Sequence, residues 1–199
     1  KLYIDFSAYY SYYQRFIGFT RVAAPASGTA SETGQNDIYA SLTDGGDTNY
    51  YKPLQLYVNL DKPVSAWGAN LSISYYVGKG ITPYINYTYA DLYNKPFKQA
   101  NNLQLTEFNT PRHKINIGVN ASKVWKGLGF SANFKWVPNY EWQAPMGDGT
   151  IKSYTTLDMA IFYVVEKAYS TFRIGGSNIY DKRYQTAIAS PFIGARYYA

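Results

Sequence analysis

The sequence predicts an all-β fold, an antiparallel transmembrane β-barrel segment of about eight strands. Three observations lead to this prediction: apolar and polar residues alternate along extended stretches, long and short connections alternate between these stretches, and charges avoid the apolar faces. Tyr supplies 23 of the 199 residues, and this side chain is common both in strands and at membrane interfaces.

The clearest alternation lies between residues 110 and 125. Ile115, Ile117 and Val119 fall on one face of the expected strand, and Lys114 and Asn116 fall on the other. A strand of a soluble β-sandwich shows the same pattern. This stretch alone therefore leaves both a protein core and a bilayer open.

The same period of two predicts the other strands. They are expected at about 1–20, 54–77, 81–93, 130–142, 154–167, 171–184 and 194–199. Within 54–77 the apolar residues change from even to odd positions. This shift predicts a bulge or break at 61–63 or at Gly68.

The connections between these strands differ in length. Long connections are expected near 23–53, 94–109, 143–153 and 185–192, and short ones near 78–80, 126–129 and 168–170. A transmembrane barrel has short turns on one side of the membrane and long loops on the other, whereas a soluble sandwich does not sort its loops in this way.

The positions of charged residues favour a bilayer. Arg or Lys facing lipid at the bilayer centre costs roughly 2–4 kcal/mol, so charges should occupy the polar parity of each strand. Those that do so are Asp5, Arg15, Lys114, Lys135, Glu141, Asp158, Arg173 and Arg196. Lys123 and Asp91 break the rule, but each lies near an expected strand end, where a side chain can reach the interface.

Aromatic residues gather near the expected strand ends. Those near the long loops are Tyr10, Tyr12, Tyr87, Tyr89, Trp136 and Trp142, and those near the short turns are Tyr75 and Trp125. Two interfacial belts are one interpretation, and the general frequency of aromatics in strands is the other.

The composition argues against an enzyme. There is no Cys, and His113 is the only His, so neither a His-based metal cluster nor a Ser-His-Asp arrangement fits within the chain. We expect no catalytic residues, no metal and no cofactor. The net charge of +6 comes from scattered residues, which is not the pattern of a nucleic-acid surface. Because Lys1 already lies within a strand pattern, we expect a fragment of a longer protein.

Five segments together resemble the C-terminal barrel strands of TonB-dependent outer-membrane receptors, especially those of Bacteroidetes. They are KLYIDFSAYY (1–10), LYVNLD (56–61), WGANL (67–71), TPRHKINIG (110–118) and GSNIYDKRYQ (176–185). The resemblance covers the whole chain through the order and spacing of these segments.

This resemblance implies that residues 1–199 are the C-terminal part of a large barrel of the 22-stranded, plugged type, without the plug domain and without the end of the final strand. It implies a bacterial outer-membrane transporter for an iron chelate, cobalamin, a glycan or a peptide. The expected partners are outer-membrane lipid and lipopolysaccharide, the receptor's own plug domain, the TonB complex through the N-terminal part, and a surface lipoprotein.

Ligand contacts are expected from aromatic residues of the long loops, namely Tyr39, Tyr50, Tyr51 and Trp142. Two alternatives stay open from the sequence. One is a soluble, aromatic-rich β-sandwich that binds carbohydrate. The other is a complete eight-stranded outer-membrane barrel with a structural or adhesive role.

Overall fold

A computed structural model describes residues 1–25, 51–60, 62–78, 80–92, 104–106, 108–144 and 147–199. The strands in these residues are β1 (Leu2–Tyr13), β2 (Ile17–Pro25), β3 (Tyr51–Asn59), β4 (Val64–Tyr75), β5 (Ile81–Leu92), β6 (Gln104–Leu105), β7 (His113–Trp125), β8 (Leu128–Val137), β9 (Tyr140–Ala144), β10 (Gly147–Ile151), β11 (Tyr154–Val165), β12 (Ser170–Ser177) and β13 (Arg196–Tyr198). A 3-10 turn, η2, covers Glu166–Ala168. No helix in these residues is long and apolar enough to cross a membrane.

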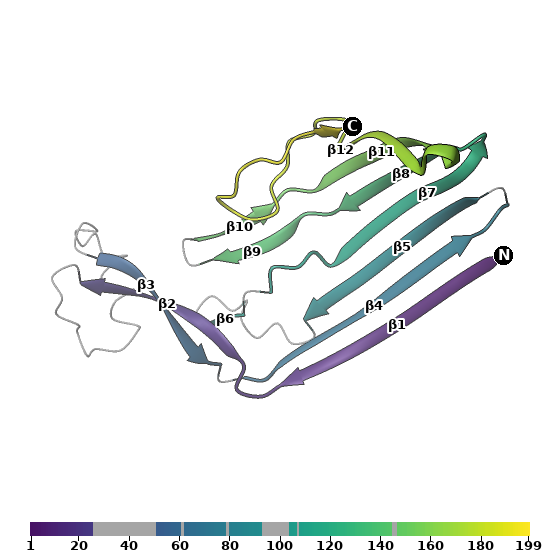
Figure 1. The fold of residues 1–199 in the computed structure, drawn as a ribbon. Coiled ribbons are helices and arrows are strands. Elements are labelled where there is room, and N and C mark those ends of the chain that lie inside the picture. Colours follow the sequence, from purple (N-terminus) through teal and green to yellow (C-terminus); the bar gives the residue numbers. More distant parts are fainter. Residues whose placement is uncertain (26–50, 61, 79, 93–103, 107, 145–146) are drawn as a thin grey trace.

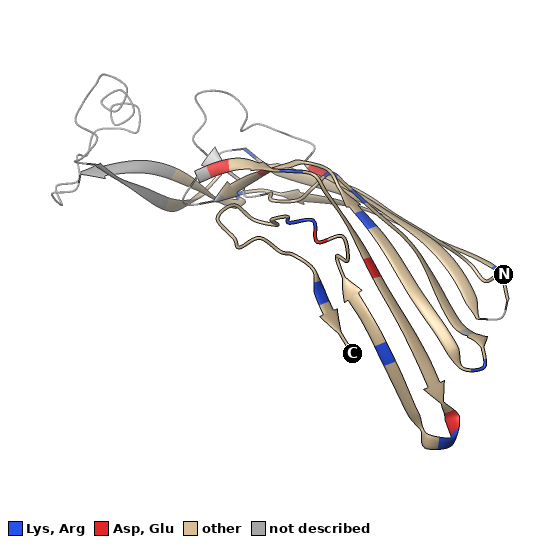
Figure 2. Cartoon of the chain, turned by 90° about the horizontal axis from the view of Figure 1, so that it is seen from above, with Lys and Arg blue, Asp and Glu red and all other residues tan. Residues whose placement is uncertain are grey.

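Eight strands form the main sheet, which confirms the expected number. Their order is β1-β4-β5-β7-β8-β11-β12-β13, and every neighbouring pair is antiparallel. The strands lie side by side (Figure 1) and the sheet curls into an arc when turned by 90° (Figure 2). Within the described residues β1 and β13 are each paired on one side only, so the eight strands do not close on themselves.

The cross-strand register aligns the two faces of successive strands. Ile117 of β7 lies beside Ile85 of β5 and Phe134 of β8. The complete apolar row is Ile4, Ile73, Ile85, Ile117, Phe134 and Leu157, and the neighbouring polar row is Asp5, Ser72, Asn86, Asn116, Lys135 and Thr156. Each row crosses the sheet from β1 to β11. Along these rows one face of the sheet is apolar and the other is polar.

The apolar face is not covered by the described part of the chain. The side chains of Ile4, Ile117 and Ile174 are 62%, 48% and 70% exposed. A soluble sandwich would bury such a face against a second sheet about 10 Å away, and the main sheet forms a single layer. An open apolar face of this extent is the one that a bilayer covers in a barrel.

The expected strand over 1–20 is wrong as a single element. The chain bends between β1 and β2, where Arg15 has a left-handed backbone (φ 52°), and the amide of Leu60 donates to the Phe16 carbonyl at 2.8 Å. β2 then pairs with β3 and β6 in a separate small sheet that projects away from the main one (Figure 1). Arg15 consequently lies in the bend and not on a strand face.

The parity change within 54–77 is explained by a break. β3 ends at Asn59 and β4 begins at Val64, so the predicted break falls on the Asp61–Pro63 side and not at Gly68. Gly68 lies within β4 beside Tyr9, and a Cβ there would be only 2.5 Å from the Tyr89 carbonyl oxygen. Close packing accounts for this glycine.

Long and short connections do separate onto opposite ends of the main sheet, but three boundaries differ from expectation. Residues near 143–153 form a hairpin of β9 and β10 and not an irregular loop. The strand expected over 171–184 ends at Ser177, because the backbone of Asn178 is left-handed (φ 52°). β2 reaches Pro25 and β3 starts at Tyr51, and the segment between them lies outside the described residues.

The turn between β7 and β8 shows why a short connection needs its glycine. Trp125 pairs with Leu128, so Lys126 and Gly127 form a two-residue turn, and both have positive φ (42° and 88°). This combination is that of a type I′ turn, whose twist matches the strands. A Cβ on Gly127 would lie 2.5 Å from the Val164 carbonyl oxygen.

We therefore expect Gly127→Ala to lower the free energy of unfolding by about 1–2 kcal/mol, the usual cost of a left-handed backbone for an alanine. Lys126→Asn is the control, because Asn tolerates this conformation and the change removes only a contact to the Trp125 ring, worth about 0.5 kcal/mol. Urea unfolding of the natural protein in lipid vesicles measures both. Equal losses from the two variants would contradict the turn assignment.

Candidate functional site

An aromatic cluster marks the long-loop end of the apolar face. The rings of Trp67 and Tyr89 are 4.7 Å apart between centroids, and those of Tyr89 and His113 are 5.1 Å apart. The Tyr87 hydroxyl and His113 Nδ1 share a hydrogen bond of 2.8 Å. All four residues lie on the parity that carries Ile85 and Ile117. This outer belt agrees with the interfacial position of aromatics in membrane barrels.

Asp91 is one of the two exceptions to the charge pattern, and its negative charge is paired with an arginine at the long-loop end of the sheet. Arg112, just before β7, places its Nε 3.2 Å from Asp91 Oδ1, and the Tyr89 hydroxyl donates to Asp91 Oδ2 at 3.4 Å. The Asp91 side chain is 17% exposed and that of Arg112 is 51% exposed. The other exception, Lys123, belongs to β7, and its side chain lies outside the description.

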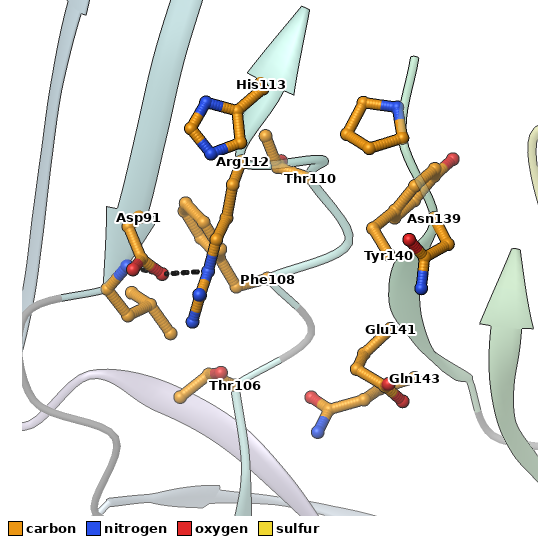
Figure 3. A pocket seen from close by; sticks show the side chains of 12 residues that line it. Asp91, Thr106, Phe108, Thr110, Arg112, His113, Asn139, Tyr140, Glu141 and Gln143 are labelled. Atoms are coloured by element: carbon orange, nitrogen blue, oxygen red, sulfur yellow. Dashed lines mark hydrogen bonds and ion pairs between the residues drawn. The ribbon is translucent and has the colours of Figure 1, made fainter. Parts of the chain in front are cut away.

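A cleft of about 470 Å³ opens directly above the belt. The ends of β5 and β7, the segment 106–112 and the start of β9 enclose it (Figure 3). Its lining combines a carboxylate, an arginine, amides and aromatic rings, represented by Glu141, Arg112, Asn139, Phe108 and Tyr140. Small-molecule sites usually have volumes of about 300–1,000 Å³, and this cleft lies within that range.

Hydrogen bonds hold the walls of the cleft in place. The Asn109 side-chain amide donates to the Gln143 carbonyl at 2.8 Å and accepts from the Gln143 main-chain N–H at 2.7 Å, so Asn109 is tied to β9. On the other side of β9, the Tyr140 hydroxyl donates to the Thr186 carbonyl at 2.9 Å. Burial raises the pKa of Tyr140.

The connection from β12 to β13, residues 178–195, folds onto the polar face within the arc of the sheet (Figure 2). Asn178, which is 3% exposed, donates its main-chain N–H to Asp158 Oδ1 at 2.8 Å. Further along this loop, Tyr184 stacks on Tyr154 with ring centroids 4.3 Å apart. The loop thus covers the long-loop end of the polar face.

The predicted ligand contacts stay a prediction. Tyr39 and Tyr50 lie outside the described residues, and Tyr51 is described only as the first residue of β3. Trp142 packs edge-on against Tyr140 at 6.5 Å without lining the cleft. The residues that do line it were missed, although Arg112 and His113 belong to the TPRHKINIG segment. No group of three or more His, Cys, Asp or Glu in the described ranges could hold a metal.

A curved antiparallel sheet with one open apolar face, one polar face, an aromatic belt and loops sorted by length defines a segment of an outer-membrane β-barrel wall. The family model described as "TonB dependent receptor-like, beta-barrel" matches residues 1–179, and the chain belongs to this family. The family places the chain in the bacterial outer membrane, and it is a family of transport proteins and not of enzymes.

Solved structures show the same fold. The copper transporter OprC has a TM-score of 0.63 at 14% identity, over 98% of this chain and 28% of OprC. The siderophore receptor PirA from Acinetobacter baumannii has a TM-score of 0.56 at 19% identity, over 98% of this chain and 29% of PirA. FpvA of P. aeruginosa with a bound pyoverdine has a TM-score of 0.54 at 15% identity, over 79% of this chain and 21% of FpvA.

This chain therefore spans about a quarter of the length of these structures, and the likeness to them is one of fold. No curated protein matches the chain. The open main sheet and the family assignment together argue against both sequence-based alternatives, the carbohydrate-binding sandwich and the complete eight-stranded barrel.

Proposed function

We propose that this chain forms the C-terminal part of the wall of a TonB-dependent outer-membrane importer. The observation that carries the proposal is the pair of continuous rows, apolar outside and polar inside, across the strands from β1 to β11. A polar inner wall suits a lumen that holds water, cargo and a plug. The cargo would be an iron chelate, cobalamin, a glycan or a peptide.

The proposed partners come from this geometry together with the family. Asp5, Lys135 and Asp158 lie on the polar face, where they would meet the plug domain of the natural protein. The apolar face and its outer belt would contact membrane lipid and lipopolysaccharide. The TonB complex would act through the N-terminal part of the receptor, and a surface lipoprotein would bind at the outer loops.

Cargo recognition would involve the outer loops. We keep Tyr39, Tyr50, Tyr51 and Trp142 as proposed ligand contacts, because aromatic rings bind chelates and sugars by stacking. The likeness to Bacteroidetes members also stays a prediction.

An uptake assay tests the function. Cells with and without the gene are supplied with labelled ferric chelates, cobalamin, oligosaccharides or peptides, with TonB present or removed. We expect one cargo class to lose uptake when either the gene or TonB is absent. Unchanged uptake of all four classes, together with recovery of the folded protein without detergent, would overturn the proposal.

A further inference from the structure

We propose that aromatic–glycine pairs on the polar face set the register of those strands that no short turn aligns. Each pair places an aromatic side chain directly opposite a glycine of the neighbouring strand. The pairs are Tyr9–Gly68 (β1 and β4), Tyr84–Gly118 (β5 and β7), Phe162–Gly129 (β8 and β11) and Tyr198–Gly175 (β12 and β13). Their role lies in the assembly of the wall and does not depend on the cargo.

In each pair the aromatic side chain occupies the space that a glycine leaves empty. A Cβ built on Gly118 would lie 2.5 Å from Cζ of Tyr84, and one built on Gly68 would lie 2.7 Å from Cε1 of Tyr9. The same contact occurs in the other two pairs, Phe162–Gly129 and Tyr198–Gly175. Any residue other than glycine would therefore displace the aromatic side chain that lies opposite.

Tyr84 shows how such a side chain crosses the neighbouring strand. Its ring lies against Gly118 of β7, and its hydroxyl donates to Asn133 Oδ1 of β8 at 3.1 Å. One side chain of β5 thus spans β7 and reaches the strand beyond it. Phe162 has the same arrangement without a hydroxyl, so the feature that the pairs share is the ring beside the glycine.

The pairs occur where the connections are long (Figure 1). Long connections join β1 to β4, β5 to β7, β8 to β11 and β12 to β13, and each of these strand pairs contains an aromatic–glycine pair. Short turns join β4 to β5, β7 to β8 and β11 to β12, and in the described register of these strands no aromatic residue lies opposite a glycine. A tight turn fixes the register by its own geometry, and a long connection does not.

Alternation fixes the faces of a strand but not its register. If β5 were shifted by two residues along β7, every side chain would stay on its face, because the side-chain period is two. Ile85 would then lie beside Ile115 or Val119, which are as apolar as its present neighbour Ile117. The ring of Tyr84 would instead meet an asparagine in place of the glycine. The aromatic–glycine pair therefore distinguishes registers that polarity leaves equivalent.

Disulfide trapping measures the register in the natural protein, freed of other cysteines and folded into lipid vesicles. Thr88→Cys with Lys114→Cys joins two opposite positions of the polar face and reports the observed register. Thr88→Cys with Asn116→Cys, and Asn86→Cys with Lys114→Cys, report shifts by two residues in the two directions. A disulfide needs Cα atoms within about 7 Å, which favours opposite over diagonal positions.

Tyr84→Thr removes the ring and keeps a residue that favours strands. We expect it to raise the ratio of shifted to observed disulfides about fivefold. Tyr84→Phe is the matched control, because it keeps the ring and removes only the bond to Asn133, and it should stay within about twofold of wild type. The aromatic residue is changed because a Cβ on Gly118 would also meet the Ala132 carbonyl oxygen at 2.7 Å. An unchanged ratio in Tyr84→Thr, or an equal rise in Tyr84→Phe, would overturn the proposal.

The strands β1 and β4 provide a second test, which decides if Tyr84→Thr does not assemble. Tyr9→Thr is compared with Tyr3→Thr, which changes an aromatic of the same strand and face that lies opposite Ser74 and not opposite a glycine. We expect only Tyr9→Thr to raise the shifted disulfides about fivefold, and equal ratios in the two variants would overturn the proposal. The cysteine positions are Ser7 with Asn70 for the observed register, and Ser7 with Ser72 or Asp5 with Asn70 for the shifted ones.

Discussion

Ile117→Arg is expected to lower the free energy of unfolding in a bilayer by about 2–4 kcal/mol. Ile117 is 48% exposed and lies between Ile85 and Phe134 on the apolar face. In a soluble protein, a charge at a half-exposed strand position would cost little, so a large loss here measures contact with lipid. Urea unfolding of the natural protein in lipid vesicles provides the value.

Asn120→Arg is the matched control for this prediction. Asn120 lies on the same strand but on the polar face, where its cross-strand neighbours Thr82 and Ser131 carry no charge. An arginine there meets water, and we expect a change within about 0.5 kcal/mol. A larger loss for Asn120→Arg than for Ile117→Arg would reverse the two faces of the sheet and with them the position of the lumen.

Much of the main sheet could be predicted because successive side chains of a strand point to opposite faces, so that apolar and polar residues alternate in the sequence. The apolar residues of 110–125 occupy one face of β7, and the turns at Lys126–Gly127 and η2 lie where the short connections were expected. The charge pattern also held for Lys135 and Asp158, which lie within β8 and β11. Alternation, turn residues and charge all act locally, and for this reason they are visible in the sequence.

The position of the first break was missed although the sequence carries a signal for it. Within 1–20 the apolar residues are even up to Phe16 and odd from Ile17, and at this shift the left-handed backbone of Arg15 turns β2 out of the main sheet. Asn178 ends β12 in the same way, within a stretch that was expected to remain extended. In both places the chain turns at a residue with a positive φ, a backbone angle that side-chain polarity alone does not specify.

The cleft could not be predicted because it depends on register. Its lining comes from the end of β5, from segment 106–112 and from the start of β9, which meet only when the strands are paired. Arg112 and Glu141 have no sequence motif in common. Each is an ordinary strand-end charge until the fold brings them to one opening.

Asp158→Ala is expected to loosen the start of the loop 178–195 on the polar face, at a cost of about 1.5–3 kcal/mol. Asp158 Oδ1 accepts the main-chain N–H of Asn178, which is 3% exposed, and hydrogen bonds to charged groups fall in this energy range. Without the carboxylate this buried N–H loses its acceptor. We therefore expect faster amide hydrogen exchange from Asn178 to Tyr184, and a smaller free energy of unfolding.

Asp5→Ala is the control, because Asp5 lies on the same polar face but is exposed. Asp5→Ala should leave the hydrogen exchange and the free energy of unfolding unchanged. If both variants have equal effects, the cause is the loss of a negative charge from the polar face and not the loss of the bond to Asn178.

The comparison has a functional meaning. The loop covers the long-loop end of the polar face, where Tyr184 stacks on Tyr154, and Asp158 is one of its attachments to β11. If Asp158→Ala also changes the rate of cargo uptake while Asp5→Ala does not, this attachment is part of the transport cycle.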